Sequence, residues 1–161
     1  MDGYQVRLAD LSSPATLVTR FTCSADQLGR RFLTDLPRIL DVALGGGCRL
    51  AGPPFALYLG GTLEELQMEI GLIIAQPHEG AADVRGSRLP GGQTASTLHV
   101  GPYETLGQAH AALRGWALAH GYVPAGLIYE LYVSDPSDGD DPNGWRTEVF
   151  LPLLGGTSGV A

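Results

Sequence analysis

The strongest constraint on the fold is an internal repeat. Four short blocks of the first half of the chain recur in the same order, and at nearly the same spacing, in the second half. The matched pairs are "TLVTR" (16–20) with "TLHVG" (97–101), "DQLG" (26–29) with "ETLG" (104–107), "ALYLG" (56–60) with "ELYVS" (130–134), and "MEIGLII" (68–74) with "TEVFLPL" (147–153). Collinear matches of this kind indicate a duplicated unit, which we place over residues 15–76 and 93–154.

Each repeat is predicted to fold as strand, helix, strand, strand. In the first repeat, residues 15–22 are strand-like, and residues 25–44 have the apolar spacing of an amphipathic helix. The glycine run at 45–47 ends this helix, and Pro37 predicts a kink or break inside it. The apolar positions on its predicted buried face are Leu28, Phe32, Leu36, Ile39 and Leu40.

The second repeat has the same pattern. Gly101 and Pro102 close a strand, and Tyr103 opens a helix that continues to Gly121. The apolar face of this helix consists of Leu106, Ala109, Leu113, Trp116 and Ala117. Each repeat then ends in an antiparallel hairpin. The predicted hairpin strands are 54–60 and 67–75 in the first repeat, and 126–134 and 146–153 in the second.

These elements predict an α+β fold. Duplicated β-α-β-β units would form an antiparallel sheet with two long helices on one face and a ligand cleft near the pseudo-two-fold axis. Residues 77–92 are polar and rich in glycine and proline, which predicts a surface linker between the repeats. The chain has 161 residues, 44% of them hydrophobic, and we expect a single domain over residues 1–154. Residues 155–161 are predicted to form a disordered tail.

Charge and composition narrow the classes of partner. The net charge is −7, and the ten basic residues are scattered, which argues against nucleic-acid binding and favours cations. The sequence has neither a leader-like segment nor an apolar run of about 20 residues, so we expect a soluble, cytoplasmic protein without membrane contact. Cys23 and Cys48 stand alone, without the spacing of a metal site, and we predict no metal and no cofactor.

Glu130 is the most unusual residue of the predicted strands. It lies in "LIYELYVSDP" (127–136), among branched and aromatic residues, where an unpaired buried charge is costly. Strand alternation puts Ile128, Glu130 and Tyr132 on one face, and we expect the helices to cover the other. The repeat places Ala56 and Tyr58 at the equivalent positions of the first unit, so the aromatic residue recurs and the acid does not.

This asymmetry predicts a binding site. Glu130 would supply one charge to a cleft lined by Tyr58 and Tyr132, with Ile128 and Ala56 beside them. A partly desolvated carboxylate attracts cations, and aromatic faces add cation–π attraction of about 0.5 to 2 kcal/mol each. Apolar, aromatic and often cationic compounds are therefore the predicted ligands. Few directional donors would give the cleft broad specificity.

The same residues resemble a known family. "RLPGGQTASTLHVGPYETL" (88–106), a helix with Trp116, and "GLIYELYVSDP" (126–136) follow each other as in the gyrase-inhibitor-like (GyrI-like) small-molecule-binding domains. These are relatives of the effector-binding domains of multidrug-sensing transcription regulators. The resemblance covers nearly the whole chain and implies a duplicated fold whose cleft binds apolar, often cationic compounds. It also implies that Glu130 is the strand glutamate of the family and Tyr103 the tyrosine of its Gly-Pro-Tyr motif.

Structural roles compete with these assignments. Glu130 could be a solvent-facing edge residue, Tyr58 and Tyr132 could be packing residues, and Tyr103 could simply staple the helix start. Trp116 is a further candidate ligand-binding residue, although core packing is expected of it more than pocket lining. Three further expectations concern polar residues: a hydrogen-bonded His99, solvent exposure of the paired Glu69 and Glu148, and a solvated acidic turn at 135–141 rather than a calcium loop.

Three functions remain open from the sequence. The first is a stand-alone protein that binds drug-like compounds for sequestration or resistance. The second, implied by the family resemblance, is a hydrolase of cyclopropane-bearing DNA-alkylating compounds, with Glu130 or less favourably Glu104 as general base. The third is a protein-interaction module that binds gyrase. The sequence lacks the DNA-binding helix-turn-helix of the regulator members, so no direct contact with nucleic acid is predicted.

Overall fold

A computed structural model describes residues 3–134 and 141–154, so the predicted tail and most of the acidic turn lie outside the described residues. The chain divides into two compact units, each with antiparallel strands and one long helix, which confirms the α+β class. The first unit is Ser13–Pro90, and the second combines Met1–Ser12 with Gly91–Ala161. In the described part of the chain, no helix is long and apolar enough to cross a membrane.

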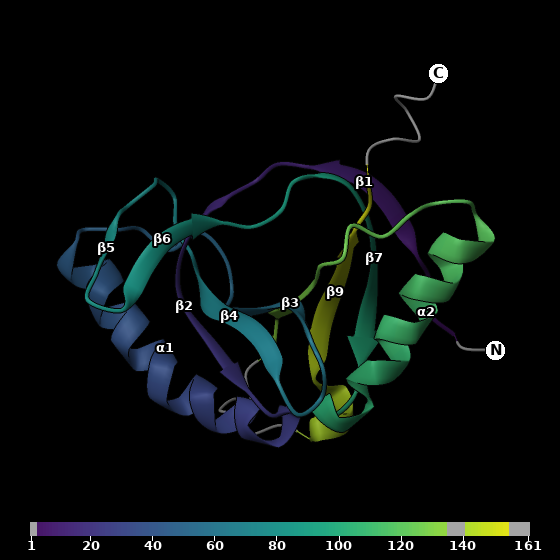
Figure 1. Cartoon of the computed structure of the whole chain (residues 1–161), viewed down its shortest axis with the longest axis horizontal. Helices are drawn as coiled ribbons and strands as arrows, with labels where there is room; N and C mark the ends of the chain where they lie inside the picture. The colour runs from purple at the N-terminus through teal and green to yellow at the C-terminus, as the bar shows by residue number, and fades with distance from the viewer. Residues whose placement is uncertain (1–2, 135–140, 155–161) are drawn as a thin grey trace. The chain divides into compact units, whose positions relative to one another are not determined.

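The first unit contains five strands in the order β3-β4-β2-β6-β5. Its helix α1 (Leu28–Gly45) follows a short 3-10 turn, η1 (Ala25–Gln27), and lies against β2 and β4 (Figure 1). The strands are β2 (Ala15–Cys23), β3 (Phe55–Gly61), β4 (Leu66–Ile73), β5 (Gly80–Ala81) and β6 (Val84–Arg88).

The described residues of the second unit form four strands in the order β1-β7-β9-β8. Its helix α2 (Leu106–Ala119) follows the 3-10 turn η2 (Tyr103–Thr105) and lies against β7 and β9 (Figure 1). The strands are β1 (Arg7–Leu11), β7 (Gly92–Val100), β8 (Ile128–Tyr132) and β9 (Arg146–Pro152). A further 3-10 turn, η4 (Pro142–Gly144), precedes β9.

The duplicated topology is confirmed by the strand pairing. In both units the first strand of the repeat pairs antiparallel with the last, and the last pairs antiparallel with the third. Ala56 pairs with Ile70 and Glu130 pairs with Val149, as the hairpin alignment predicts. The match of the first strands was wrong by three residues.

The correct match of the first strands follows from their partners. Thr16 pairs with Ile73 and Thr94 with Pro152, which are equivalent positions of β4 and β9. Thr16 therefore corresponds to Thr94 rather than to Thr97. Both threonines are buried, as are the residues that follow them, so burial agrees with the pairing.

In each unit, one strand pairs with a strand that is not its neighbour in the sequence. β1 directly precedes β2 in the chain, yet it pairs with β7 of the second unit. β6 directly precedes β7, yet it pairs with β2 of the first unit. The prediction of a linker at 77–92 was therefore wrong, because β5 and β6 form a hairpin there whose Val84 is buried against the core. The glycine and proline content reflects tight turns instead.

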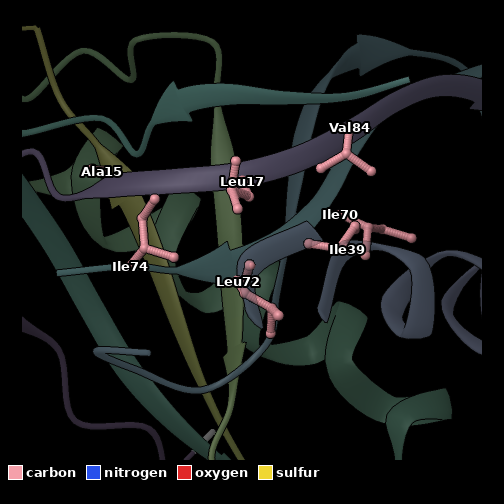
Figure 2. Packing of buried hydrophobic residues seen from close by; sticks show 8 residues of the cluster. Ala15, Leu17, Ile39, Ile70, Leu72, Ile74 and Val84 are labelled. Atoms are coloured by element: carbon pink, nitrogen blue, oxygen red, sulfur yellow. The ribbon is translucent and has the colours of Figure 1, made fainter. Parts of the chain in front are cut away.

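The core of the first unit lies between α1 and its sheet. Figure 2 shows Ile39 of α1 among Leu17, Ile70 and Leu72 from the strands. Leu28, Phe32 and Leu36 pack against this cluster as predicted, whereas Leu40 is 36% exposed and lies outside it.

The predicted break at Pro37 is wrong, because α1 continues as one helix from Leu28 to Gly45. Proline deprives the carbonyl group of residue 33 of its helical partner. Leu33 is exposed, so water can reach that carbonyl and the cost of the lost hydrogen bond is small.

In the second unit, Leu106, Ala109, Leu113 and Ala117 are the buried residues of α2, as predicted. Trp116 is only half-buried and does not belong to this face. Its ring stacks on His120 and Tyr122, at centroid distances of 4.3 and 5.4 Å. The apolar spacing assigned Trp116 to the buried face of the helix. Trp116 lies at the border of that face, where its large ring stacks on residues at the end of the helix instead.

A buried carboxylate ties α1 to its sheet. Asp35 is 2% exposed and accepts hydrogen bonds from the Thr19 hydroxyl at 2.7 Å, from Arg31 at 2.9 Å and from Arg38 at 3.0 Å. Burial alone would raise the pKa of this carboxyl, but the hydrogen bonds from Thr19, Arg31 and Arg38 hold it below its ordinary value.

We predict that Gly71→Ala destabilises the protein by about 2 kcal/mol. A Cβ atom on Gly71 would lie 2.3 Å from the backbone oxygen of Leu17 and 3.0 Å from the ring of Phe55, in a central strand that cannot shift freely. Gly29→Ala is the control, since nothing lies within 4 Å of its Cβ position in α1 and the change should stabilise by up to about 1 kcal/mol. Urea unfolding of both variants measures the difference; equal effects would contradict this packing.

A second prediction concerns acid stability. Because the pKa of Asp35 is lower in the folded state, its charge stabilises the fold above about pH 4. This contribution disappears as pH falls through the folded-state value. Asp35→Asn should lower the free energy of unfolding at pH 7 by about 2 kcal/mol and flatten its decline in acid. The exposed Asp41→Asn on the same helix should leave the acid decline unchanged. An unaltered decline in Asp35→Asn would overturn the assignment.

Candidate functional site

Glu130 lies in the middle of β8 and is only 1% exposed. Its carboxylate faces α2, because His110 of that helix contacts it. The prediction that Ile128, Glu130 and Tyr132 face away from the helix was therefore wrong. Alternation grouped these residues correctly, but both faces of β8 carry apolar residues, so the pattern could not tell which face the helix covers. The solvent-facing interpretation of Glu130 is also excluded.

Two hydrogen bonds hold the carboxylate of Glu130 in place. The Nε2–H of His110 donates to Oε2 at 2.6 Å, and the hydroxyl of Tyr132 donates to Oε1 at 2.5 Å. His110 is 15% exposed and comes from the second turn of α2, whereas Tyr132 is two residues from Glu130 on the same strand. The arrangement fixes the carboxylate from two directions and ties α2 to the sheet.

His110 was not among the residues predicted from the sequence. A signal was present, because His110 follows Leu106 by four residues and precedes Leu113 by three, which puts it on the apolar stripe of the helix. A polar residue on a buried stripe, in the same repeat as a buried acid, suggests that the two meet.

An aromatic group adjoins the carboxylate. The ring of Tyr103, from η2, meets the ring of Tyr132 edge-on at 5.6 Å between centroids. The ring of Tyr103 also contacts the ring of Trp145, which lies just before β9, with 4.9 Å between the ring centroids. Tyr103, Tyr132 and Trp145 thus form a chain of rings that ends at Glu130, and we call these four residues the Glu130 cluster. The predicted association of Tyr103 and Tyr132 with Glu130 is present in the structure.

His99 anchors the start of the helix segment. It is buried, as expected of a hydrogen-bonded residue, and lies 2.8 Å from the Tyr4 hydroxyl through Nδ1. Its Nε2 lies 3.1 Å from the carbonyl of Pro102 and 3.0 Å from the hydroxyl of Thr105. These contacts fix η2, and with it the backbone that carries Tyr103.

The remaining predicted residues lie in different places. Ile128 is buried on the same side of β8 as Glu130. Ala56 and Tyr58 belong to the first unit, where they pair with Ile70 and Met68 on the α1 side of the sheet. The role of Ala56 and Tyr58 toward a ligand of Glu130 stays a prediction.

Two further predicted site residues, Trp116 and Glu104, have surroundings that do not suit their predicted roles. Trp116 stacks at the C-terminal end of α2, nearly two helical turns from His110. Glu104 is exposed in η2, which does not suit a buried general base. Trp116 and Glu104 are therefore not counted in the Glu130 cluster.

The expected solvent exposure of Glu69 was wrong. Glu69 is 2% exposed and forms an ion pair with Arg20, which lies opposite it on β2. Glu148, at the matching position of β9, is exposed as predicted and lies opposite Leu98. The pairing partner therefore decides the outcome: a cation across the strand allows burial of Glu69.

The first unit also contains a polar cavity of about 490 Å³. It is lined by Arg20 and the turn of the β5–β6 hairpin, including Glu79, Asp83 and Arg85. Asp83 is already engaged by Arg38 at 2.6 Å. The mixed charges and solvent access of this hollow make it a weaker candidate than the Glu130 cluster for an apolar ligand.

The face of β8 opposite Glu130 carries the side chains of Tyr129 and Leu131. Tyr129 is buried there and stacks on Phe150 with 4.8 Å between ring centroids. Burial, together with the nearby carboxylate of Glu148, raises the pKa of Tyr129 to about 12, so its phenol stays neutral. The ionisable chemistry of this strand is therefore concentrated on the helix side, where a fixed carboxylate beside aromatic rings can attract a cation or accept a proton.

Solved structures share this fold. The C-terminal domain of EcmrR has a TM-score of 0.82 at 20% identity, and the match covers 94% of this chain and 98% of that one. The chain spans 58% of EcmrR as seen in its complex with DNA. A hydrolase from Listeria innocua matches with a TM-score of 0.64 at 16% identity, over 93% of this chain and 92% of that one.

A fourth structure, SAV2435 bound to tetraphenylphosphonium, has a TM-score of 0.58 at 12% identity, over 96% of both chains. At these identities the likeness establishes the fold alone. No curated protein matches the sequence.

The family itself is established by sequence. The model of the GyrI-like small molecule binding domain matches residues 58–154, a segment that includes α2, β8, β9 and the whole Glu130 cluster. The match covers more than half of the chain and confirms the resemblance inferred from the motifs around Tyr103 and Glu130. The chain therefore belongs to the family of GyrI-like small molecule binding domains.

Proposed function

We propose that this protein binds apolar, aromatic and often cationic compounds, with Glu130 as the charge that attracts them, and that it serves in sequestration or resistance. The observation that carries the proposal is a carboxylate that is 1% exposed and adjoins the rings of Tyr132, Tyr103 and Trp145. Family membership supports the general class of ligand.

Electrostatics favour a cationic ligand at this position. A buried carboxylate has lost most of its hydration, so it gains more from a cation than an exposed carboxylate does. The neighbouring rings add cation–π attraction and contact area. The net charge of −7 favours cations over anions at longer range as well.

A ligand must reach Glu130 from the side of the cluster that meets the surface. His110 is 15% exposed, and Tyr103 and Tyr132 are half-buried, so these groups reach the surface while the carboxylate does not. Rings that can change rotamer would admit a flat ligand and uncover the charge behind them. In such a site the aromatic contact area of a ligand contributes more to affinity than its precise shape does, which favours broad specificity.

We predict that Glu130→Gln weakens binding of tetraphenylphosphonium by tenfold or more, about 1.4 kcal/mol. The amide keeps the size of the side chain and removes its charge. Isothermal titration calorimetry measures the dissociation constant, and thermal unfolding verifies that the variant is folded. A neutral aromatic of similar size should lose less than threefold, since it gains nothing from the charge.

Glu69→Gln is the matched control. Glu69 is an equally buried strand carboxylate, but its charge is engaged by Arg20. This variant should be destabilised and should keep the affinity for tetraphenylphosphonium. If Glu69→Gln and Glu130→Gln weaken binding equally, the effect comes from overall charge or stability, and the site assignment is wrong.

A second candidate is hydrolysis of cyclopropane-bearing compounds, and the contact between Glu130 and His110 favours it. A carboxylate that is oriented by an imidazole can take a proton from water while the water oxygen attacks one carbon of the strained ring. The carbon–carbon bond breaks, its electron pair goes to the other carbon, and that carbon gains the proton. The similar fold of a Listeria innocua hydrolase is consistent with this chemistry.

Mass spectrometry separates turnover from binding. If the protein is such a hydrolase, incubation with a cyclopropane-bearing alkylating compound yields a product heavier by one water, and Glu130→Gln abolishes product formation while His110→Gln slows it. Unchanged substrate mass in the presence of saturable binding would rule the hydrolase out. Gyrase binding stays a prediction from the family name, which a pull-down with purified gyrase tests.

A further inference from the structure

Two buried polar groups of the second unit have no hydrogen-bond partner among the residues that the structure describes. They are the indole Nε1–H of Trp145 and the hydroxyl of Thr147. Thr147 is completely buried. Polar groups are rarely left unpaired inside proteins, because they lose their hydrogen bonds to water and gain nothing in exchange. Two such groups only two residues apart in the sequence therefore require an explanation.

Trp145 belongs to the Glu130 cluster, and Thr147 lies beside it. Trp145 and Thr147 are two residues apart on extended backbone, so their side chains lie on the same face of the sheet. Thr147 lies directly opposite Tyr132, whose hydroxyl donates to Glu130. The ring of Trp145 contacts Tyr103, which in turn contacts Tyr132. Pairing and ring contacts independently place the two groups beside the proposed site.

Other buried threonines show what a structural role looks like. Thr19 donates to Asp35, Thr94 donates to the carbonyl of Gly92, and Thr97 donates to the carbonyl of Gln5. Each of these hydroxyls has found an acceptor within its own unit. Thr147 differs from them, because no described residue accepts a hydrogen bond from its hydroxyl.

We infer that Trp145 and Thr147 select, among aromatic cations, those that also carry a hydrogen-bond acceptor such as a carbonyl or ether oxygen. This inference rests on the proposed function and names its ligand class more closely. An indole N–H can only donate, and a threonine hydroxyl can donate as well, so the pair offers two donors to one acceptor. The ligand places its charge at Glu130 and its acceptor at Trp145 and Thr147.

The physical basis is the asymmetry between making and losing a hydrogen bond. A ligand without an acceptor leaves both donors as they are, with no hydrogen-bond partner among the described residues, and gains nothing from them. A ligand with an acceptor satisfies groups whose desolvation cost is already part of the fold. Discrimination between the two ligands then depends on these donors and not on Glu130.

The test uses a matched pair of cations: tetraphenylphosphonium, which has no acceptor, and its 4-acetylphenyl analogue, which adds one carbonyl. The wild-type protein should bind the acetyl analogue at least fivefold more tightly. Thr147→Val keeps the shape and removes the hydroxyl, and Trp145→Phe keeps a ring and removes the N–H. Each should reduce the preference for the acetyl analogue by threefold or more. Thr147→Val should also change the affinity for tetraphenylphosphonium by less than twofold, whereas Trp145→Phe alters a ring of the cluster and is judged by the ratio of the two affinities alone.

Thr16→Val is the matched control. Thr16 is also buried, and its hydroxyl has no hydrogen-bond partner in the part of the chain that the structure describes, but it belongs to the β2 strand of the first unit. Removal of either hydroxyl should raise the melting temperature or leave it unchanged. Only Thr147→Val should alter the preference between the two cations.

The outcomes separate this inference from the proposed function. If both cations bind through Glu130 and no variant changes the preference, the inference fails and the proposed function stands. If Thr147→Val lowers the melting temperature and weakens both cations equally, the hydroxyl is structural and the inference is overturned. If neither cation binds, both proposals fail.

Discussion

Burial of a carboxylate under each helix is the interaction on which the two units depend. Asp35 projects from α1 to Thr19 in the sheet, and Glu130 projects from the sheet to His110 in α2. In both cases a polar contact crosses the helix–sheet interface, where apolar packing alone sets no unique position for the helix. The two units reach the same topology with the acid on opposite partners of the interface.

The chemistry of the two contacts differs more than their geometry. Asp35 is met by the guanidinium groups of Arg31 and Arg38, which are permanently charged, so its charge is balanced within the unit. Glu130 is met by an imidazole and a phenol and is bordered by aromatic rings. The duplicated fold thus devotes one buried acid to stability, and the surroundings of the other suit recognition. Symmetry of the backbone does not require symmetry of the side chains.

The sequence predicted the order of elements and the pairing of both hairpins, because collinear repeats and strand alternation depend on local spacing. It also singled out Glu130, Tyr103 and Tyr132, which lie together in the structure. It could not predict which face of β8 meets α2, since Tyr129 and Ile128 are both buried and the pattern is apolar on either side. His110 and the burial of Glu69 depend on partners distant in the sequence, and no local pattern contains that information. The β5–β6 hairpin was missed because a two-residue strand rich in glycine resembles a linker.

The pairing of β1 with β7 affects the order in which the two units can be completed during synthesis. The first unit is continuous from Ser13 to Pro90, and every strand it needs is available once β6 has been made. The second unit uses β1, the first strand of the chain, but β1 gains its partner only when β7 emerges. Until then residues 7–11 remain an unpaired strand with an exposed backbone, the kind of segment that other chains can capture. The first unit can thus be complete while β1, which precedes it in the chain, still waits for β7.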